Sequence, residues 1–155
     1  MFTNKDIVMA PSPTSPTPLA PTNALMWYND PTNGMQCWRH GKASGATVAG
    51  LVYKCAHTTT SDLVTVTAAA NHGRAELIGV AQHVIADGSY GWWLCYGVGS
   101  VTAESEIAAG GKFGTEGSAG KGGDARVPGG CEIGRAHNSA VIAAGATGTA
   151  FINCL

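Results

Sequence analysis

Glycine is the residue that most constrains this fold, because it fills 22 of the 155 positions, about twice the share found in an average protein. It divides the sequence after residue 33 into short apolar runs that have the length of β-strands. The runs expected to form strands are Met35–Arg39, Thr47–Lys54, Leu63–Thr67, Glu76–Ala81, Trp92–Val98 and Ala150–Cys154. The sequence therefore predicts an all-β fold with little helix.

Three segments between these runs differ in character. Asn29–Gly34 contains the Asn-Asp-Pro-Thr-Asn-Gly sequence that predicts a tight turn between two apolar runs. Ala103–Ala109 could form two helical turns that end at a glycine pair, although a capping box is missing. Residues 110–130 are so rich in glycine that we expect a long, mobile loop there.

Proline dominates residues 10–22, where it fills five of thirteen positions. Because proline fixes φ and lacks an amide donor, this stretch can be neither a helix nor a central strand. We expect a polyproline-II-like arm, and a disordered tail is the alternative. Apolar residues at both ends favour an anchored arm over a solvating tail. They are Phe2, Ile7, Val8 and Met9 before the prolines, and Leu25, Met26, Trp27 and Tyr28 after them. We therefore assign residues 1–33 to the arm and residues 34–155 to a β domain.

The second half of the chain repeats a short pattern. Ile-Gly-x-Ala, a spacer and Ile-Ala-x-Gly-x-x-Gly occur at residues 78–91 and again at 133–148, where the spacer is two residues longer. The pattern predicts a strand, a tight glycine turn and a second strand. The two copies could be opposed halves of one small barrel, although chance similarity is a real alternative in a chain so rich in alanine and glycine.

Charge is scarce, at 12% of the residues, and the formal net charge is −1. A chain without a basic patch is not expected to bind nucleic acid. The weakly polar surface favours a protein that is covered by partner subunits, and a small Gly-rich monomer is the alternative.

Cysteine usage and hydropathy indicate where the chain is made. The five cysteines form no CxxC pair and their number is odd, which favours free buried thiols in a reducing cytoplasm over a disulfide framework. The N-terminus lacks the apolar core of a signal peptide. The longest weakly polar run, Ala140–Ile152, is too short to span a bilayer. We expect no membrane association.

Enzyme motifs are missing. None of the three Gly-Lys pairs is followed by Ser or Thr, as a Walker A loop requires, and no Gly-x-Ser-x-Gly elbow occurs. The most metal-like group is Cys37, His40, Cys55 and His57, but its spacing is tighter than that of zinc sites. We therefore expect no enzyme, no cofactor and no metal.

Trp92 and Trp93 form the most conspicuous aromatic pair. On a strand, adjacent side chains point to opposite faces. One indole is therefore expected in the core, and the other against a neighbouring subunit or a ligand. A carbohydrate-stacking platform is the alternative role for the outer indole.

Two short sequences resemble the capsid decoration, or cement, proteins of tailed bacteriophages. The first runs from Leu77-Ile78-Gly79-Val80-Ala81 through Ile85–Trp92 to Gly97-Val98-Gly99, and the second is Ile133-Gly134-Arg135-Ala136 with the C-terminal run. The similarity covers about residues 45–155. The Pro-rich arm and the 110–130 loop are longer here than in usual members of that family.

The resemblance implies a small antiparallel β-barrel or β-tulip-like decoration domain. It further implies a structural virion protein, made in the host cytoplasm, that binds the outer surface of an expanded capsid. Such a protein would assemble as a homotrimer and stabilise neighbouring copies of the major capsid protein. The candidate capsid or subunit contacts are Phe2, Ile7, Val8, Leu25, Met26, Trp27, Tyr28, Trp92 and Trp93. The alternative function is a virion adhesin or carbohydrate-binding β module.

Overall fold

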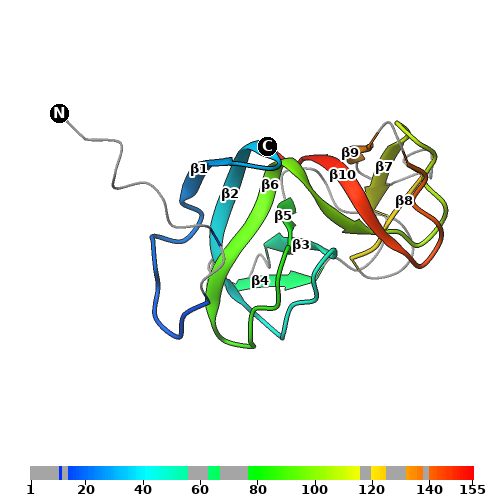
Figure 1. The fold of residues 1–155 in the computed structure, drawn as a ribbon. Coiled ribbons are helices and arrows are strands. Elements are labelled where there is room, and N and C mark those ends of the chain that lie inside the picture. The colour runs from blue at the N-terminus through cyan, green and yellow to red at the C-terminus, as the bar shows by residue number, and fades with distance from the viewer. Residues whose placement is uncertain are drawn as a thin grey trace.

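The computed structural model describes residues 11, 14–55, 63–66, 77–115, 120–124, 132–137 and 140–155. In these residues the chain forms ten β-strands and no helix (Figure 1). The strands are β1 (Leu25–Asp30), β2 (Gly34–Ala43), β3 (Val52–Cys55), β4 (Leu63–Val66), β5 (Leu77–Val80), β6 (Tyr90–Thr102), β7 (Lys112–Thr115), β8 (Gly122–Asp124), β9 (Glu132–Ala136) and β10 (Thr147–Asn153). The all-β prediction is confirmed.

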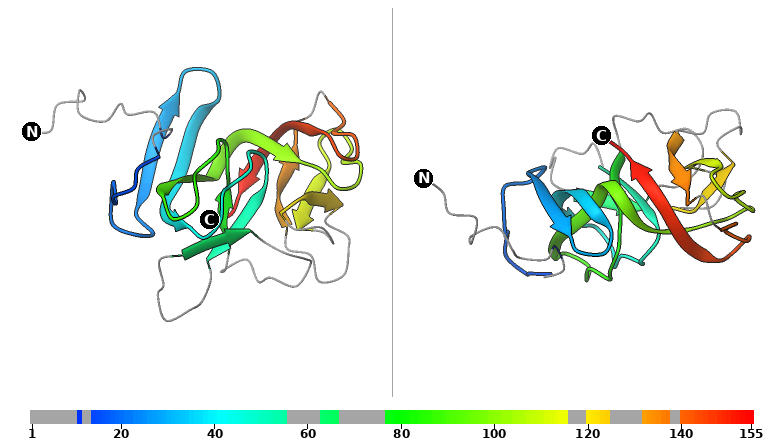
Figure 2. Two further views of the ribbon diagram at one scale, coloured as in Figure 1. Left: turned by 90° about the horizontal axis from the view of Figure 1, so that it is seen from below. Right: turned by 45° about the horizontal axis from the view of Figure 1, so that its top comes forward.

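The strands form one sheet with the order β1-β2-β4-β3-β5-β6-β10-β9-β7-β8, and β2 also pairs with β6. All of these pairings are antiparallel except that of β2 with β4. The β1–β2 hairpin and the β7–β9 strands lie at opposite ends of the molecule (Figures 1 and 2). The sheet is therefore not one closed barrel, and the prediction of a single small β-barrel is corrected.

Two successive five-strand units share β6. The first unit contains β2 to β6 and the second contains β6 to β10, and their pairings correspond one by one. The antiparallel pairing of β3 with β5 has a bulge after Tyr53, and that of β7 with β9 has one after Phe113. The parallel contact of β2 with β4 corresponds to a parallel bridge between Ala103 and Gly122.

The turn before the last strand is also repeated. Ala43 accepts a hydrogen bond from the amide of Gly88 and donates one to the carbonyl of Ser89, at 3.0 and 2.8 Å. Ala103 makes the same pair of bonds with Gly145 and Ala146, both at 2.9 Å. The sequence repeat is thus a structural repeat, but its copies are successive units and not opposed halves of one barrel.

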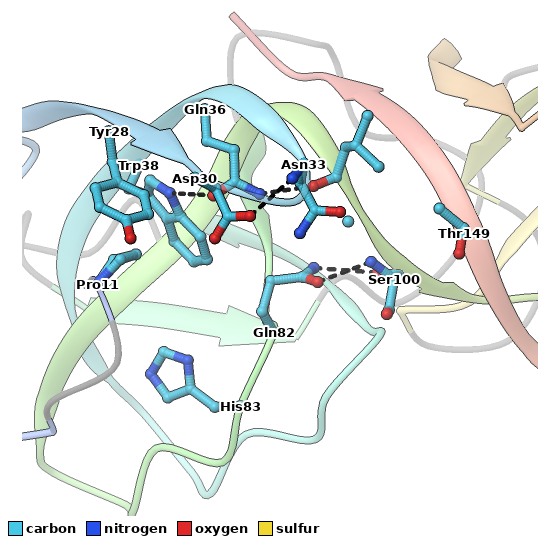
Figure 3. A pocket seen from close by; sticks show the side chains of 12 residues that line it. Pro11, Tyr28, Asp30, Asn33, Gln36, Trp38, Gln82, His83, Ser100 and Thr149 are labelled. Atoms are coloured by element: carbon cyan, nitrogen blue, oxygen red, sulfur yellow. Dashed lines mark hydrogen bonds between the residues drawn. The ribbon is translucent and has the colours of Figure 1, made fainter.

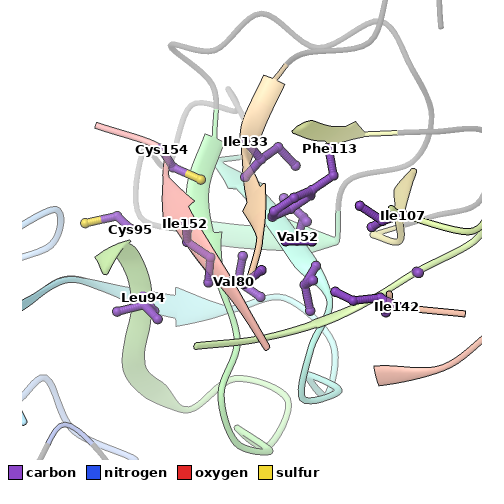
Figure 4. Close-up of a cluster of buried hydrophobic side chains, with 14 of the residues drawn as sticks. Val52, Val80, Leu94, Cys95, Ile107, Phe113, Ile133, Ile142, Ile152 and Cys154 are labelled. Atoms are coloured by element: carbon purple, nitrogen blue, oxygen red, sulfur yellow. The ribbon is translucent and has the colours of Figure 1, made fainter. Parts of the chain in front are cut away.

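Each unit has its own buried centre. In the first unit it consists of Ala43, Tyr53, Ala81, Ile85 and Trp93. The equivalent residues of the second unit are Ala103, Phe113, Ala136, Ile142 and Ala150. The second centre continues into a larger apolar cluster with Val52, Val80, Leu94, Ile133 and Ile152 (Figure 4). Burial of these side chains is the main favourable contribution to folding.

All six predicted strand runs contain a strand, although residues 47–51 are a loop. Three strands were not predicted, namely β1, β7 and β8, whereas β9 contains the Ile-Gly-x-Ala run of the second repeat. The expected helix at Ala103–Ala109 is wrong, because Ala103 and Ile107 are in extended backbone and form isolated β-bridges with Gly122 and Ile142. The segment 110–130, which we expected to be a loop, contains strands β7 and β8. Glycines face each other in this strand pair, for example Gly114 and Gly123.

The described part of the Pro-rich segment folds back onto its own domain. Ser15 exchanges two backbone hydrogen bonds with Tyr90, at 3.1 and 2.8 Å. The amide of Asn23 donates a hydrogen bond to the carbonyl of His40, and the amide of His40 donates one to the carbonyl of Ala24, both at 2.9 Å. The sheet then begins at Leu25, inside the residues that we assigned to the arm.

Candidate interaction surface

Three aromatic side chains from separate strands form a row on the surface. Trp27 of β1 contacts Tyr96 of β6 at 5.8 Å between ring centroids, and Tyr96 contacts Phe151 of β10 at 5.1 Å. Trp27 is 51% exposed and Phe151 is 39% exposed. Adjacent aromatic rings that remain this exposed are typical of a surface that another molecule covers.

Alternation along β1 determines which of its side chains join this aromatic row. Leu25 and Trp27 are exposed, whereas Met26 and Tyr28 are half-buried against the core. Met35 of β2 is paired with Asn29 and is 54% exposed. Leu25 and Met35 therefore extend the apolar surface on the Trp27 side of the hairpin.

A hollow of about 300 Å³ adjoins Phe151. Its other lining residues are Glu132, Ile133, Gly134, Arg135 and Asn153. Glu132 is held by Lys112, whose Nζ lies 2.9 Å from its Oε2. The aromatic row therefore ends beside this hollow, since Phe151 belongs to both.

The predicted contact residues have different positions. Leu25 and Trp27 are on the surface, while Met26 and Tyr28 face inward. Phe2, Ile7 and Val8 lie outside the described residues. Tyr96 and Phe151 were not predicted as contacts. No local sequence pattern identifies these two residues, because their contact depends on the register of β10 with β6.

Trp92 and Trp93 are both buried, at 8% and 0% exposure. They belong to different core clusters, so the prediction of opposite faces is confirmed. The expectation that one indole faces outward is wrong, because Ala20 of the Pro-rich segment packs against the cluster that contains Trp92.

His40 lies beneath the same Pro-rich segment and is fully buried. Its ring stacks on Tyr90 at 5.8 Å and contacts Trp92 at 5.0 Å between centroids. Neither ring nitrogen has a hydrogen-bond partner of good geometry among the described residues. Burial lowers the pKa of His40, and the nearby Pro21 carbonyl only partly opposes this effect.

Cys37 and His40 have different neighbours. Cys37 lies in the core beside Cys95, whose Sγ donates to the Cys37 carbonyl at 3.1 Å. The side chain of Cys55 and all of His57 lie outside the described residues. No group of three His, Cys, Asp or Glu residues in the described part of the chain could hold a metal ion. The same part contains no helix long and apolar enough to cross a membrane.

The fold and this surface define a small, internally duplicated all-β domain with an exposed row of aromatic side chains. No family model matches the chain, and no curated protein matches its sequence. Among solved structures, the fold is similar to the N base of the head fiber protein gp8.5 of bacteriophage phi29. The TM-score is 0.57 at 18% identity, over 77% of this chain and 96% of that one. The two proteins therefore share a fold.

Proposed function

We propose that this chain is a non-catalytic structural protein of a tailed-phage virion. It binds the outer surface of the expanded capsid as a homotrimeric cement subunit and stabilises neighbouring copies of the major capsid protein. The exposed row of Trp27, Tyr96 and Phe151 is the observation that carries this proposal. The fold shared with a head fiber base supports attachment to a phage head.

The chemistry of the row fits a protein partner. Aromatic residues dominate the binding energy at the centres of protein interfaces, where neighbouring groups exclude water. Trp27 and Phe151 are separated by Tyr96 only, so a partner can desolvate all three rings together. In a trimer, three such rows act together, and weak individual contacts give tight attachment.

Binding to purified expanded capsids tests this proposal. We expect the double variant Trp27→Ser/Phe151→Ser to bind at least about thirtyfold more weakly, because loss of an interface hot spot costs about 2 kcal/mol or more. Val141→Ser is the matched control, since Val141 is 53% exposed and lies outside the row. Equal binding by the double variant and the control would refute the role of the row.

The role of the arm requires a different truncation from the one that the sequence suggests. Removal of residues 1–33 would delete β1 and disrupt the sheet. Removal of residues 1–10 takes away Phe2, Ile7 and Val8 and keeps the contact between Ser15 and Tyr90. We expect this shorter protein to fold, to remain trimeric in sedimentation equilibrium and to bind capsids more weakly. A monomeric full-length chain would contradict the trimer.

The adhesin alternative has lost the observation that motivated it. It rested on an outward indole at Trp92 or Trp93, and both indoles are buried.

A further inference from the structure

A second hollow, of about 310 Å³, lies beneath the β1–β2 hairpin. Five separate parts of the chain line it: Pro11, the hairpin, the loop after β5, β6 and Thr149 of β10. Figure 3 shows Tyr28, Asp30 and Trp38 projecting from the hairpin, with His83 on the loop across from them. Tyr28 and Asp30 alternate with Trp27 along β1, so they point to the other face of that strand.

Protein hydrogen bonds fix the walls of this hollow. Gln36 donates from Nε2 to the carbonyl of Val98 at 2.7 Å and accepts from Nε1 of Trp38 at 3.2 Å. Gln82 accepts from the amide of Ser100 at 2.7 Å and donates to its carbonyl at 3.1 Å. These side chains are already satisfied, and the shape of the hollow is therefore set before any ligand arrives.

Other lining groups are suited to hold a ligand. Asp30 is oriented by the amides of Thr32 and Asn33, which donate to its Oδ1 at 2.9 and 2.7 Å. Nε2 of His83 is buried without a hydrogen-bond partner among the described residues. Such a group costs free energy unless a ligand or water bonds to it. Burial also lowers the pKa of His83, which favours the neutral imidazole.

The composition of the lining restricts the ligand class. Among the described residues that line the hollow there is no Lys or Arg, and Asp30 is the one acidic residue. An anion would meet a carboxylate without a compensating cation. A neutral sugar can instead place its C–H face on an aromatic ring and share its hydroxyl groups with a carboxylate and an imidazole. The volume lies at the small end of ligand pockets and suits one or two sugar rings.

We propose that this hollow binds a neutral saccharide, held by Asp30 and His83 against the half-buried ring of Tyr28. A single carboxylate does not provide the pair that glycoside hydrolysis ordinarily needs, so the site binds the sugar and leaves it intact. This activity is separate from capsid attachment through the row of Trp27, Tyr96 and Phe151.

The test uses the full chain and saturation-transfer NMR. The neutral probes are N-acetylglucosamine, its dimer, maltose and galactose. N-acetylneuraminic acid and inorganic phosphate are the anionic probes. We expect at least one neutral probe to bind with a Kd on the order of 1 mM. Asp30→Asn should weaken binding about tenfold, because it removes the charge but keeps an oxygen for the amides of Thr32 and Asn33.

Asp87→Asn is the matched control, since Asp87 accepts from the amide of Gly45 at 2.7 Å and does not line the hollow. His83→Ala should weaken binding independently of Asp30. The proposal is overturned if no neutral probe binds at about 20 mM, a concentration well above the expected Kd. Binding that survives both Asp30→Asn and His83→Ala also overturns it, as does a preference for the anionic probes. Unchanged amide NMR spectra outside the hollow establish that each variant is folded.

Discussion

Gly79 and Gly134 occupy equivalent positions in the two five-strand units. A Cβ on Gly79 would lie 2.5 Å from the carbonyl oxygen of Leu94, and one on Gly134 would collide with the carbonyl oxygen of Phe151. Each glycine thus allows its strand to approach the backbone of the last strand in its unit. This close approach explains why the second residue of both Ile-Gly-x-Ala sequences is glycine.

Gly134→Ala should destabilise the protein strongly. The new methyl group meets a backbone atom that cannot move aside, so we expect a loss of about 3 kcal/mol or more in the free energy of unfolding. Gly145→Ala is the comparison, because Gly145 has a φ of +76° but open space around its Cβ position. Its cost should be about 1 kcal/mol. Urea denaturation measures both, and equal losses would contradict the close approach.

Glycine spacing made part of this fold predictable from the sequence. The repeated turn was visible because Gly88 and Gly145 have left-handed φ values, and Ile85 and Ile142 pack where Gly91 and Gly148 leave room. The strands β7 and β8 were hidden because small residues form them, and Lys112–Thr115 contains one large apolar side chain. These two strands have a low intrinsic strand propensity, and pairing with neighbouring strands stabilises them.

The surface was less predictable than the fold. Trp27 could be named because it follows the prolines. Phe151 and Tyr96 could not, since their contact depends on the register of β10 with β6. The outward indole expected for one of Trp92 and Trp93 was wrong, because the sequence does not reveal that the Pro-rich segment returns to pack against the cluster of Trp92. Packing between segments that are far apart in the sequence cannot be inferred from local residue patterns.

Tyr53 and Phe113 are equivalent, but only Tyr53 carries a hydroxyl group. That oxygen accepts a hydrogen bond from the amide of Val48 at 2.8 Å. Tyr53→Phe should therefore cost about 1 kcal/mol, because the amide loses its partner. Phe113→Leu serves as a packing control and should cost more, since it leaves a cavity at a fully buried ring. A Tyr53→Phe variant as stable as the natural chain in thermal unfolding would argue against this bond.

The buried thiols should be unreactive in the folded protein. Cys37, Cys95 and Cys154 are buried and form no disulfide bond. Burial raises the pKa of Cys95 strongly, and the neighbouring Cys37 raises it further. We expect N-ethylmaleimide to label these three at least about a hundredfold more slowly than the same residues in guanidinium, because labelling requires opening of the core. Mass spectrometry locates the labels.

An introduced surface thiol provides the reference for that measurement. Val141→Cys places a thiol at a position that is 53% exposed, and it should react rapidly in the folded state. If Cys95 in the folded protein reacts as fast as this new cysteine, then the core opens far more readily than its packing indicates.

Acid should loosen the contact between the Pro-rich segment and the sheet. Burial lowers the pKa of His40 below the value of 6.5 that an unperturbed histidine has. At pH 7.5 the imidazole is neutral in both the folded and the unfolded chain. Below about pH 6.5 the unfolded chain binds a proton that the folded chain resists, so the free energy of unfolding falls as the pH falls. The limiting slope is about 1.4 kcal/mol per pH unit for one such group.

His40→Phe isolates this contribution, because the ring lies between Tyr90 and Trp92 and its nitrogens make no good hydrogen bond among the described residues. The variant should be about as stable as the natural chain at pH 7.5 and should lose less stability between pH 7.5 and 5. Some pH dependence should remain, since burial also lowers the pKa of His83. Urea titrations across this pH range measure each slope, and an unchanged slope in His40→Phe would mean that protonation of His40 does not control the segment.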